Sequence, residues 1–202
     1  MLDKVLHRIV ANPWVYDHFQ KFMGREQTLR RLKPYLADSG GRVVLDVGGG
    51  TGSVETIVPP SATYISLDND WQKHQGLKRK WPAALSIQGD ATSICLQNKS
   101  VDYAMCIALT HHLTDDQLPL LFKELARVVK CKLIFLDPVK SEGSIISGIL
   151  WRYDRGAYPR SAEALKMILE RYFEIEEIEQ YTLQHTYILC SAKPKESSAN
   201  VT

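Results

Sequence analysis

The sequence has no long apolar run, little net charge and no long basic tract, and each absence argues against a class of protein. No stretch approaches the roughly 18 consecutive apolar residues that a membrane-spanning helix needs, so we expect no membrane span. The net charge is only +2, which argues against a nucleic-acid partner. The basic residues at 78–80 form a short cluster of the kind that usually lies on a solvated face.

Closely spaced cysteines are also lacking. The four cysteines are Cys95, Cys106, Cys131 and Cys190, and no pair has the spacing of a zinc or redox motif. Cys106 and Cys190 lie in apolar runs, which predicts buried thiols. The first ten residues lack the apolar core of a signal peptide. These features favour a reducing compartment, and we expect a cytoplasmic protein.

The length and composition are those of one ordinary globular domain. A chain of 202 residues can bury a substantial core, and its 45% hydrophobic and 24% charged residues are a soluble balance. We expect a single domain over residues 1–192 and a disordered polar tail over 193–202. Within the domain, a helical cover (1–38) precedes a central core (40–138), and an insert (139–161) follows it.

Five short apolar runs in the core end in glycine or polar residues, at 42–47, 62–68, 83–90, 101–109 and 131–137. Because they alternate with helix-like segments, clearest at 115–130, they predict a parallel sheet with helices on both faces. After a helix at 161–172, the runs 173–181 and 185–192 predict a closing antiparallel pair. The expected fold is a doubly wound α/β domain with a mostly parallel seven-stranded sheet, which binds ligands beyond the carboxyl ends of its strands.

Four glycines fall in LDVGGGTG, residues 45–52, directly after the first run. Glycine is entropically costly in regular structure, so the cluster indicates that something lies very close to the backbone here. The dinucleotide fingerprint G-x-G-x-x-G would need its third glycine at position 53, which is Ser53. The sequence has instead Asp46-x-Gly48-x-Gly50-x-Gly52.

This pattern resembles the first motif of the class I S-adenosylmethionine-dependent methyltransferases, and residues 89–113 and 124–138 resemble the motifs that follow it. The resemblance covers about residues 40–138 and is greatest to the small-molecule branch that includes ubiquinone- and menaquinone-type methyltransferases. It implies a Rossmann-like methyltransferase fold that binds S-adenosyl-L-methionine and releases S-adenosyl-L-homocysteine. The donor-binding residues that it implies are Asp46, Gly48, Gly49, Gly50, Gly52, Asp68, Asn69, Asp90, Ala91, Ile107 and Ala108, with Tyr16 from the N-terminal cover.

The resemblance also implies a role for each acid. Asp46 meets the ammonium group of the donor, directly or through water, and Asp90 meets the adenine amino group. Asp68 lies 18 residues beyond Gly50, and its carboxylate can accept hydrogen bonds from both ribose hydroxyls. Tyr16 either reaches the donor carboxylate or packs on the sheet with the neighbouring aromatic residues.

Methyl transfer from a sulfonium is an in-line displacement, so the enzyme mainly aligns the reacting atoms. A base is needed only if the acceptor carries a proton. His111 and His112 follow the fourth strand, where one of them can serve as general base; alternatively, both only shape the pocket. No acid precedes Asp115 in this loop, and Asp137 alone would be a poor magnesium site, so we expect a metal-independent enzyme.

The acceptor is expected between the N-terminal helices and the insert, whose candidate substrate-side residues are Trp151, Tyr153, Arg155, Tyr158 and Arg160. Aromatic rings with arginines suit a flat or acidic small organic molecule, although the same residues also fit an ordinary core helix with solvated arginines. The [DN]-P-P-[YF] motif of nucleic-acid amino methyltransferases is absent. Two other functions stay open: a catalytically silent methyltransferase-like subunit and an NAD-dependent oxidoreductase.

Overall fold

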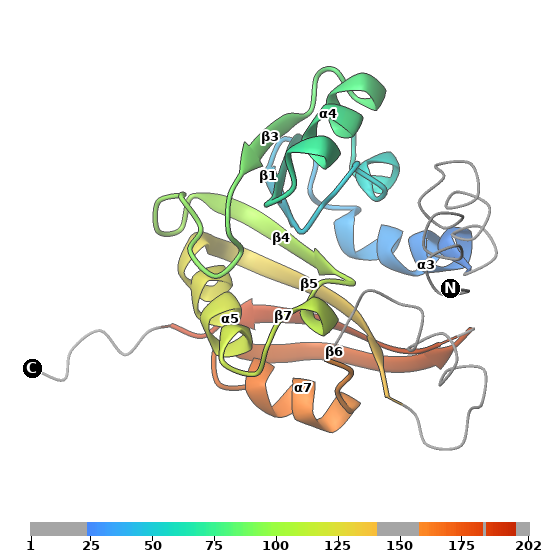
Figure 1. The fold of residues 1–202 in the computed structure, drawn as a ribbon, viewed down its shortest axis with the longest axis vertical. Helices are drawn as coiled ribbons and strands as arrows, with labels where there is room; N and C mark the ends of the chain where they lie inside the picture. The colour runs from blue at the N-terminus through green and yellow to red at the C-terminus, as the bar shows by residue number, and fades with distance from the viewer. Residues whose placement is uncertain (1–23, 141–157, 184, 197–202) are drawn as a thin grey trace, which may run out of the picture.

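The computed structural model describes residues 24–140, 158–183 and 185–196. In these residues a seven-stranded sheet has the order β3-β2-β1-β4-β5-β7-β6 (Figure 1). The strands are β1 Val43–Val47, β2 Thr63–Asp68, β3 Leu85–Gln88, β4 Val101–Ile107, β5 Val129–Val139, β6 Phe173–Thr182 and β7 Thr186–Pro194. Strands β1 to β5 pair in parallel, and β7 pairs antiparallel with both β5 and β6. The expected doubly wound, mostly parallel fold is therefore confirmed.

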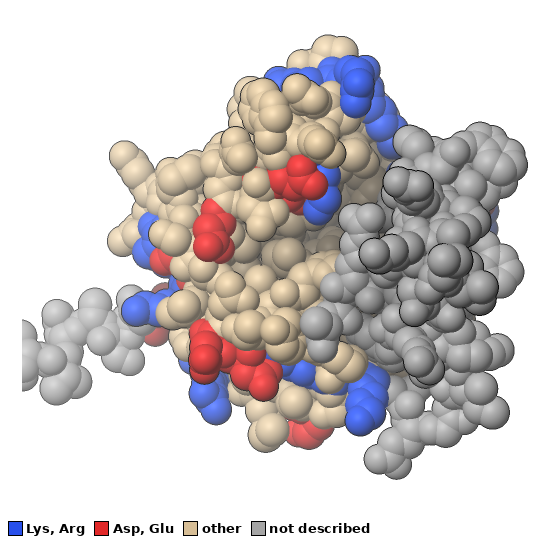
Figure 2. Space-filling model, in the orientation of Figure 1, with Lys and Arg blue, Asp and Glu red and all other residues tan. Residues whose placement is uncertain are grey.

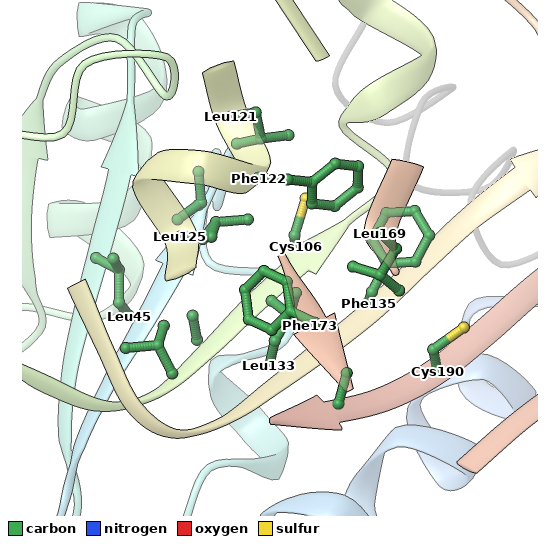
Figure 3. Packing of buried hydrophobic residues seen from close by; sticks show 14 of the residues in the cluster. Leu45, Cys106, Leu121, Phe122, Leu125, Leu133, Phe135, Leu169, Phe173 and Cys190 are labelled. Carbon is green, nitrogen blue, oxygen red and sulfur yellow. The ribbon is translucent and has the colours of Figure 1, made fainter. Parts of the chain in front are cut away.

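Helices cover both faces of the sheet because successive strand residues point to opposite sides. The described helices are α3 Arg25–Leu32, α4 Trp71–Lys80, α5 Gln117–Val128 and α7 Ala162–Leu169, with 3₁₀ helices η1 Lys33–Leu36, η2 Glu55–Ile57 and η3 Thr110–His112. Phe135 packs in the cluster under α5 and α7, whereas the preceding Ile134 packs in the cluster under α3 and α4. In the first cluster the rings of Phe122 and Phe135 meet edge to face at 5.6 Å (Figure 3).

Several element boundaries differ from those that the sequence predicted. β5 starts at Val129, immediately after α5, and continues to Val139, whereas the expected strand covered 131–137. β7 continues to Pro194, so the expected tail boundary at 193 is wrong. The reason is that β7 stays paired with β6 to its end, and Lys193 forms a salt bridge with Glu176. Of the expected N-terminal cover, residues 1–23 lie outside the described residues.

All four cysteines are free thiols, and Cys106 and Cys190 are buried, as their apolar surroundings predicted. Burial raises the pKa of Cys190 to about 12 and the pKa of Cys106 well above its usual value. Both thiols are therefore protonated and unreactive near neutral pH.

None of the helices that the structure describes is long and apolar enough to cross a membrane.

Candidate functional site

The loops that follow β2, β1 and β4 meet at one edge of the sheet, because the carboxyl ends of parallel strands share an edge. Backbone hydrogen bonds hold these loops to neighbouring strands. Gly48 donates to the Leu67 carbonyl over 2.7 Å, and Ala108 donates to the Leu136 carbonyl over 2.7 Å. The glycine cluster, Asp68 and the histidine pair therefore occupy successive positions along one edge.

The glycine cluster forms a tight turn. Gly48, Gly50 and Gly52 have φ of 74°, 56° and 74°, a region that other residues rarely adopt. The turn leads into η2, which has only three residues. A dinucleotide site brings its pyrophosphate to the N-terminus of a full helix. The segment after this turn has no such helix, which agrees with Ser53 in arguing against a dinucleotide.

Asp46 lies beneath the turn. A Cβ added to Gly49 would lie 2.6 Å from the Asp46 carboxylate and 2.5 Å from Ser66 Oγ, so only glycine fits there. The Tyr64 hydroxyl donates a hydrogen bond to Asp46 over 2.6 Å. Burial raises the pKa of Asp46 to about 7, and the Tyr64 hydrogen bond limits the rise. Asp46 thus supports the turn from below, with 2% of its surface exposed.

Asp68 joins the turn to α4. Its Oδ2 accepts from the Gly50 amide over 3.0 Å and from Lys73 Nζ over 3.3 Å, and its Oδ1 accepts from the Asp70 amide over 3.0 Å. Asp70 instead caps α4, since its side chain accepts from the Gln72 amide over 2.8 Å. The structure therefore separates the two acids: Asp68 faces the glycine turn and Asp70 starts the helix.

Arg25 is a residue at this site that the sequence reasoning missed. It begins α3, directly after Gly24, whose φ is 76°. Its Nη2 donates to the Ser53 carbonyl over 2.9 Å, next to the glycine turn. Its Nε is buried without a hydrogen-bond partner among the described residues. A buried donor on a cation is costly to leave unpaired, so this guanidinium is suited to an anionic group of a ligand. No local sequence signal marks an arginine that acts across 28 residues.

The expected adenine and methyl-side residues lie on either side of the turn. Asp90 follows β3 and is exposed, and its Oδ1 accepts from the Thr92 amide and hydroxyl, both over 2.8 Å. Asn69 is exposed after β2, and Ala91 is half-buried after β3. Ala108 is exposed after Ile107 with φ 53°, a strained value for alanine. Such strain persists only where neighbouring structure enforces it.

His111 is held by a carboxylate from the next strand. Asp137, fully buried in β5, accepts from His111 Nδ1 over 2.7 Å and from the amides of Leu109 and Thr110 over 3.1 and 2.7 Å. His111 itself is 5% exposed. His112 is exposed, and its ring lies 4.1 Å from the ring of His111. The two histidines therefore differ: Asp137 orients His111 and leaves His112 at the surface.

The end of the insert contacts the same loop. The Tyr158 amide donates to the His111 carbonyl over 3.0 Å. Arg160 donates to the carbonyls of Thr110 and Leu113 over 2.8 and 2.7 Å and pairs with Asp115 over 2.7 Å. These bonds occupy the Arg160 guanidinium and hold the loop that carries His111 and His112. Of the other candidates, Tyr16, Trp151, Tyr153 and Arg155 lie outside the described residues.

Outside the grey region, the face shown in Figure 2 is mostly uncharged, with basic side chains mainly at its upper and lower margins and acidic side chains in a few separate groups. Among the described residues, no group of three or more histidine, cysteine or acidic side chains could hold a metal ion. The part of the site that the structure describes consists of the glycine turn, the carboxylates that bind it to its neighbours, and the oriented histidine.

One family model matches the central part of the chain. Residues 44–132 match the family model described as a methyltransferase domain, whereas no curated protein matches the chain.

Similar solved structures share the fold at low sequence identity. Magnesium protoporphyrin IX methyltransferase from Synechocystis, solved with bound S-adenosylhomocysteine, has a TM-score of 0.71. Its identity to this chain is 16%, and the match covers 94% of this chain and 99% of that chain. The PH0226 protein from Pyrococcus horikoshii has a TM-score of 0.70, 18% identity and coverage of 91% and 93%. Geranyl diphosphate C-methyltransferase from Streptomyces coelicolor, in complex with Mg²⁺, geranyl diphosphate and S-adenosylhomocysteine, has a TM-score of 0.70, 11% identity and coverage of 84% and 80%.

Proposed function

We propose that the chain is a class I S-adenosylmethionine-dependent methyltransferase of the small-molecule type, which the match of residues 44–132 to a methyltransferase domain supports. We further propose that it methylates a protonated heteroatom of a small organic acceptor without a metal ion. The observation that carries this proposal is the arrangement along one edge: the glycine turn lies between Asp68 on β2 and the Asp137-oriented His111 after β4. The β2 side of the turn suits the donor, and the β4 side suits the acceptor. We also propose a cytosolic location, which the four free thiols support.

The residues present fit the donor. The glycine turn is open at Gly50, where an added Cβ would meet nothing closer than 3.6 Å. The unpaired Nε of Arg25 matches a carboxylate, and Asp68 matches the ribose hydroxyls. Asp90 and Ala91 would hold the adenine, and Ile107 and Ala108 would line the reacting end. When bound, the donor supplies a methyl group on a positively charged sulfur, so that the leaving group is already activated.

Asp137 determines which ring nitrogen of His111 can accept a proton. Asp137 Oδ2 accepts from the Leu109 and Thr110 amides, and its Oδ1 faces His111 Nδ1. A carboxylate cannot donate, so His111 Nδ1 carries the hydrogen and Nε2 carries the lone pair. We infer that Nε2 takes the proton of the acceptor. Asp137 directs its oxygens at these three donors, which supports a metal-independent reaction.

We expect Asp68→Ala to weaken the binding of S-adenosylhomocysteine by about 1.5–3 kcal/mol, because the ribose loses hydrogen bonds to a charged group. Isothermal titration calorimetry measures this, with circular dichroism as the check on folding. The control is Asp70→Ala, which removes the cap of α4, costs about 1 kcal/mol of stability and leaves donor affinity unchanged. If Asp70→Ala lost binding and Asp68→Ala did not, Asp70 and not Asp68 would be the carboxylate that binds the ribose. Tight NAD binding by the native enzyme would overturn the proposed function.

Arg25→Met should lower the affinity for S-adenosylhomocysteine about ten-fold or more, because the donor carboxylate loses its charged partner. The same variant should bind 5′-methylthioadenosine as the native enzyme does, since that nucleoside lacks the amino-acid part. Arg30→Met is the matched control, because Arg30 is exposed on the same helix and pairs with Glu26. Equal losses for both nucleosides would mean that Arg25 only shapes the turn.

A further inference from the structure

The Asp68 carboxylate has fewer open acceptor positions than its proposed role requires. An ionised carboxylate offers about four lone-pair positions. Three are occupied, by the amides of Gly50 and Asp70 and by the ammonium group of Lys73. The side chain is 4% exposed. Two ribose hydroxyls would need two acceptor positions, and one remains.

Of the three present donors, only Lys73 can leave. The Gly50 and Asp70 amides belong to the backbone of the glycine turn and of the start of α4, so their release would move both elements. The Lys73 side chain is 48% exposed, and its ammonium is a mobile group on a flexible stem. Water can replace Asp68 as its partner.

Lys73 also lies against the glycine turn. A Cβ added to Gly50 would be 3.6 Å from Lys73 Cδ and 3.9 Å from Asp68 Oδ2. The stem of this lysine therefore borders the same glycine and the same oxygen that the ribose would approach. The acid and its competitor lie only five residues apart, on β2 and in the first turn of α4.

We propose that Lys73 competes with the donor ribose for Asp68 and so lowers the affinity for both donor and product. The inference rests on the proposed function, because it assumes that Asp68 accepts the ribose hydroxyls. When both hydroxyls bind, the ammonium group leaves Oδ2 for solvent; when the product dissociates, it returns. By lowering the affinity for the product, Lys73 favours product release.

The test compares Lys73→Met, which keeps the stem and removes the ammonium, with the native enzyme. We expect calorimetry at low salt to show S-adenosylhomocysteine bound about three-fold more tightly by the variant, the size of an exposed ion pair. The 2′,3′-dideoxy counterpart should bind both proteins equally, because it has no hydroxyls to compete. Added salt should narrow the difference. Arg79→Met, which removes a charge from the exposed last turn of α4, is the control and should bind as the native enzyme does.

The outcomes separate the two proposals. Unchanged or weaker binding by Lys73→Met, with native S-adenosylhomocysteine binding intact, would overturn the competition and leave the proposed function standing. A three-fold gain that also appears with the dideoxy compound, or in Arg79→Met, would overturn it as well, since the effect would then be one of general charge. A folded native enzyme that binds no S-adenosylhomocysteine would overturn the proposed function itself.

Discussion

His111→Asn is expected to slow methyl transfer about 10²–10⁴-fold while leaving the affinity for S-adenosylhomocysteine unchanged. Asparagine can keep a hydrogen bond to Asp137, but it has no nitrogen that accepts a proton near neutral pH. The measurement is turnover across pH on an acceptor found by screening phenols, hydroxy acids, thiols and amines. A rate defect of the variant that depends on pH, with donor affinity intact, would support a histidine base.

The structure provides two comparisons for this prediction. His112→Asn should retain most of the activity, because His112 is exposed and Asp137 bonds its neighbour. Asp137→Asn should also lower the rate and alter the pH profile, since its amide no longer selects the Nδ1–H form of His111. Full activity in both histidine variants would exclude a histidine base and leave catalysis to alignment alone.

Gly52→Ala is expected to cost about 2–5 kcal/mol of unfolding free energy. About 1–2 kcal/mol arises because alanine is strained at φ 74°, and about 1–3 kcal/mol arises from overpacking. The added Cβ would collide with Leu77, which is fully buried in α4, and would lie 3.0 Å from Trp81. Trp81 cannot move freely, because its Nε1 donates to the Gly52 carbonyl over 3.2 Å. Urea denaturation followed by circular dichroism measures the loss.

Gly41→Ala is the matched control. Gly41 has a similar φ of 72°, but an added Cβ would meet no atom within 4 Å. Its cost should therefore be the strain alone, about 1–2 kcal/mol. If the two variants were equally destabilised, the packing of α4 against the glycine turn would contribute nothing, and the turn would be specified by backbone conformation only.

The position of the site could be predicted from local sequence. Apolar runs ending in LDVGGGTG, in Asp68 and in Thr110-His111-His112 mark strand ends, and parallel strands bring their carboxyl ends to one edge. The Asp70 cap was also predictable, because capping depends on neighbours within one helical turn. By contrast, the sequence predicts that the fifth strand starts at residue 131, whereas β5 starts at Val129. The boundary is missed because the apolar pattern continues through Val128 and Val129 without a break.

The partners of the site residues depend on the tertiary structure. Asp137 holds His111 across 26 residues, Arg160 holds Thr110 across 50, and Arg25 reaches Ser53 across 28. Periodicity reports which face of an element is buried, but it carries no information on which distant side chain meets that face. The sequence by itself thus determined the strands, the glycine turn and the edge at which the candidate site residues lie. Only the packing of β5, α3 and the end of the insert against that edge decided that His111 is the oriented histidine and that Arg160 binds the loop carbonyls.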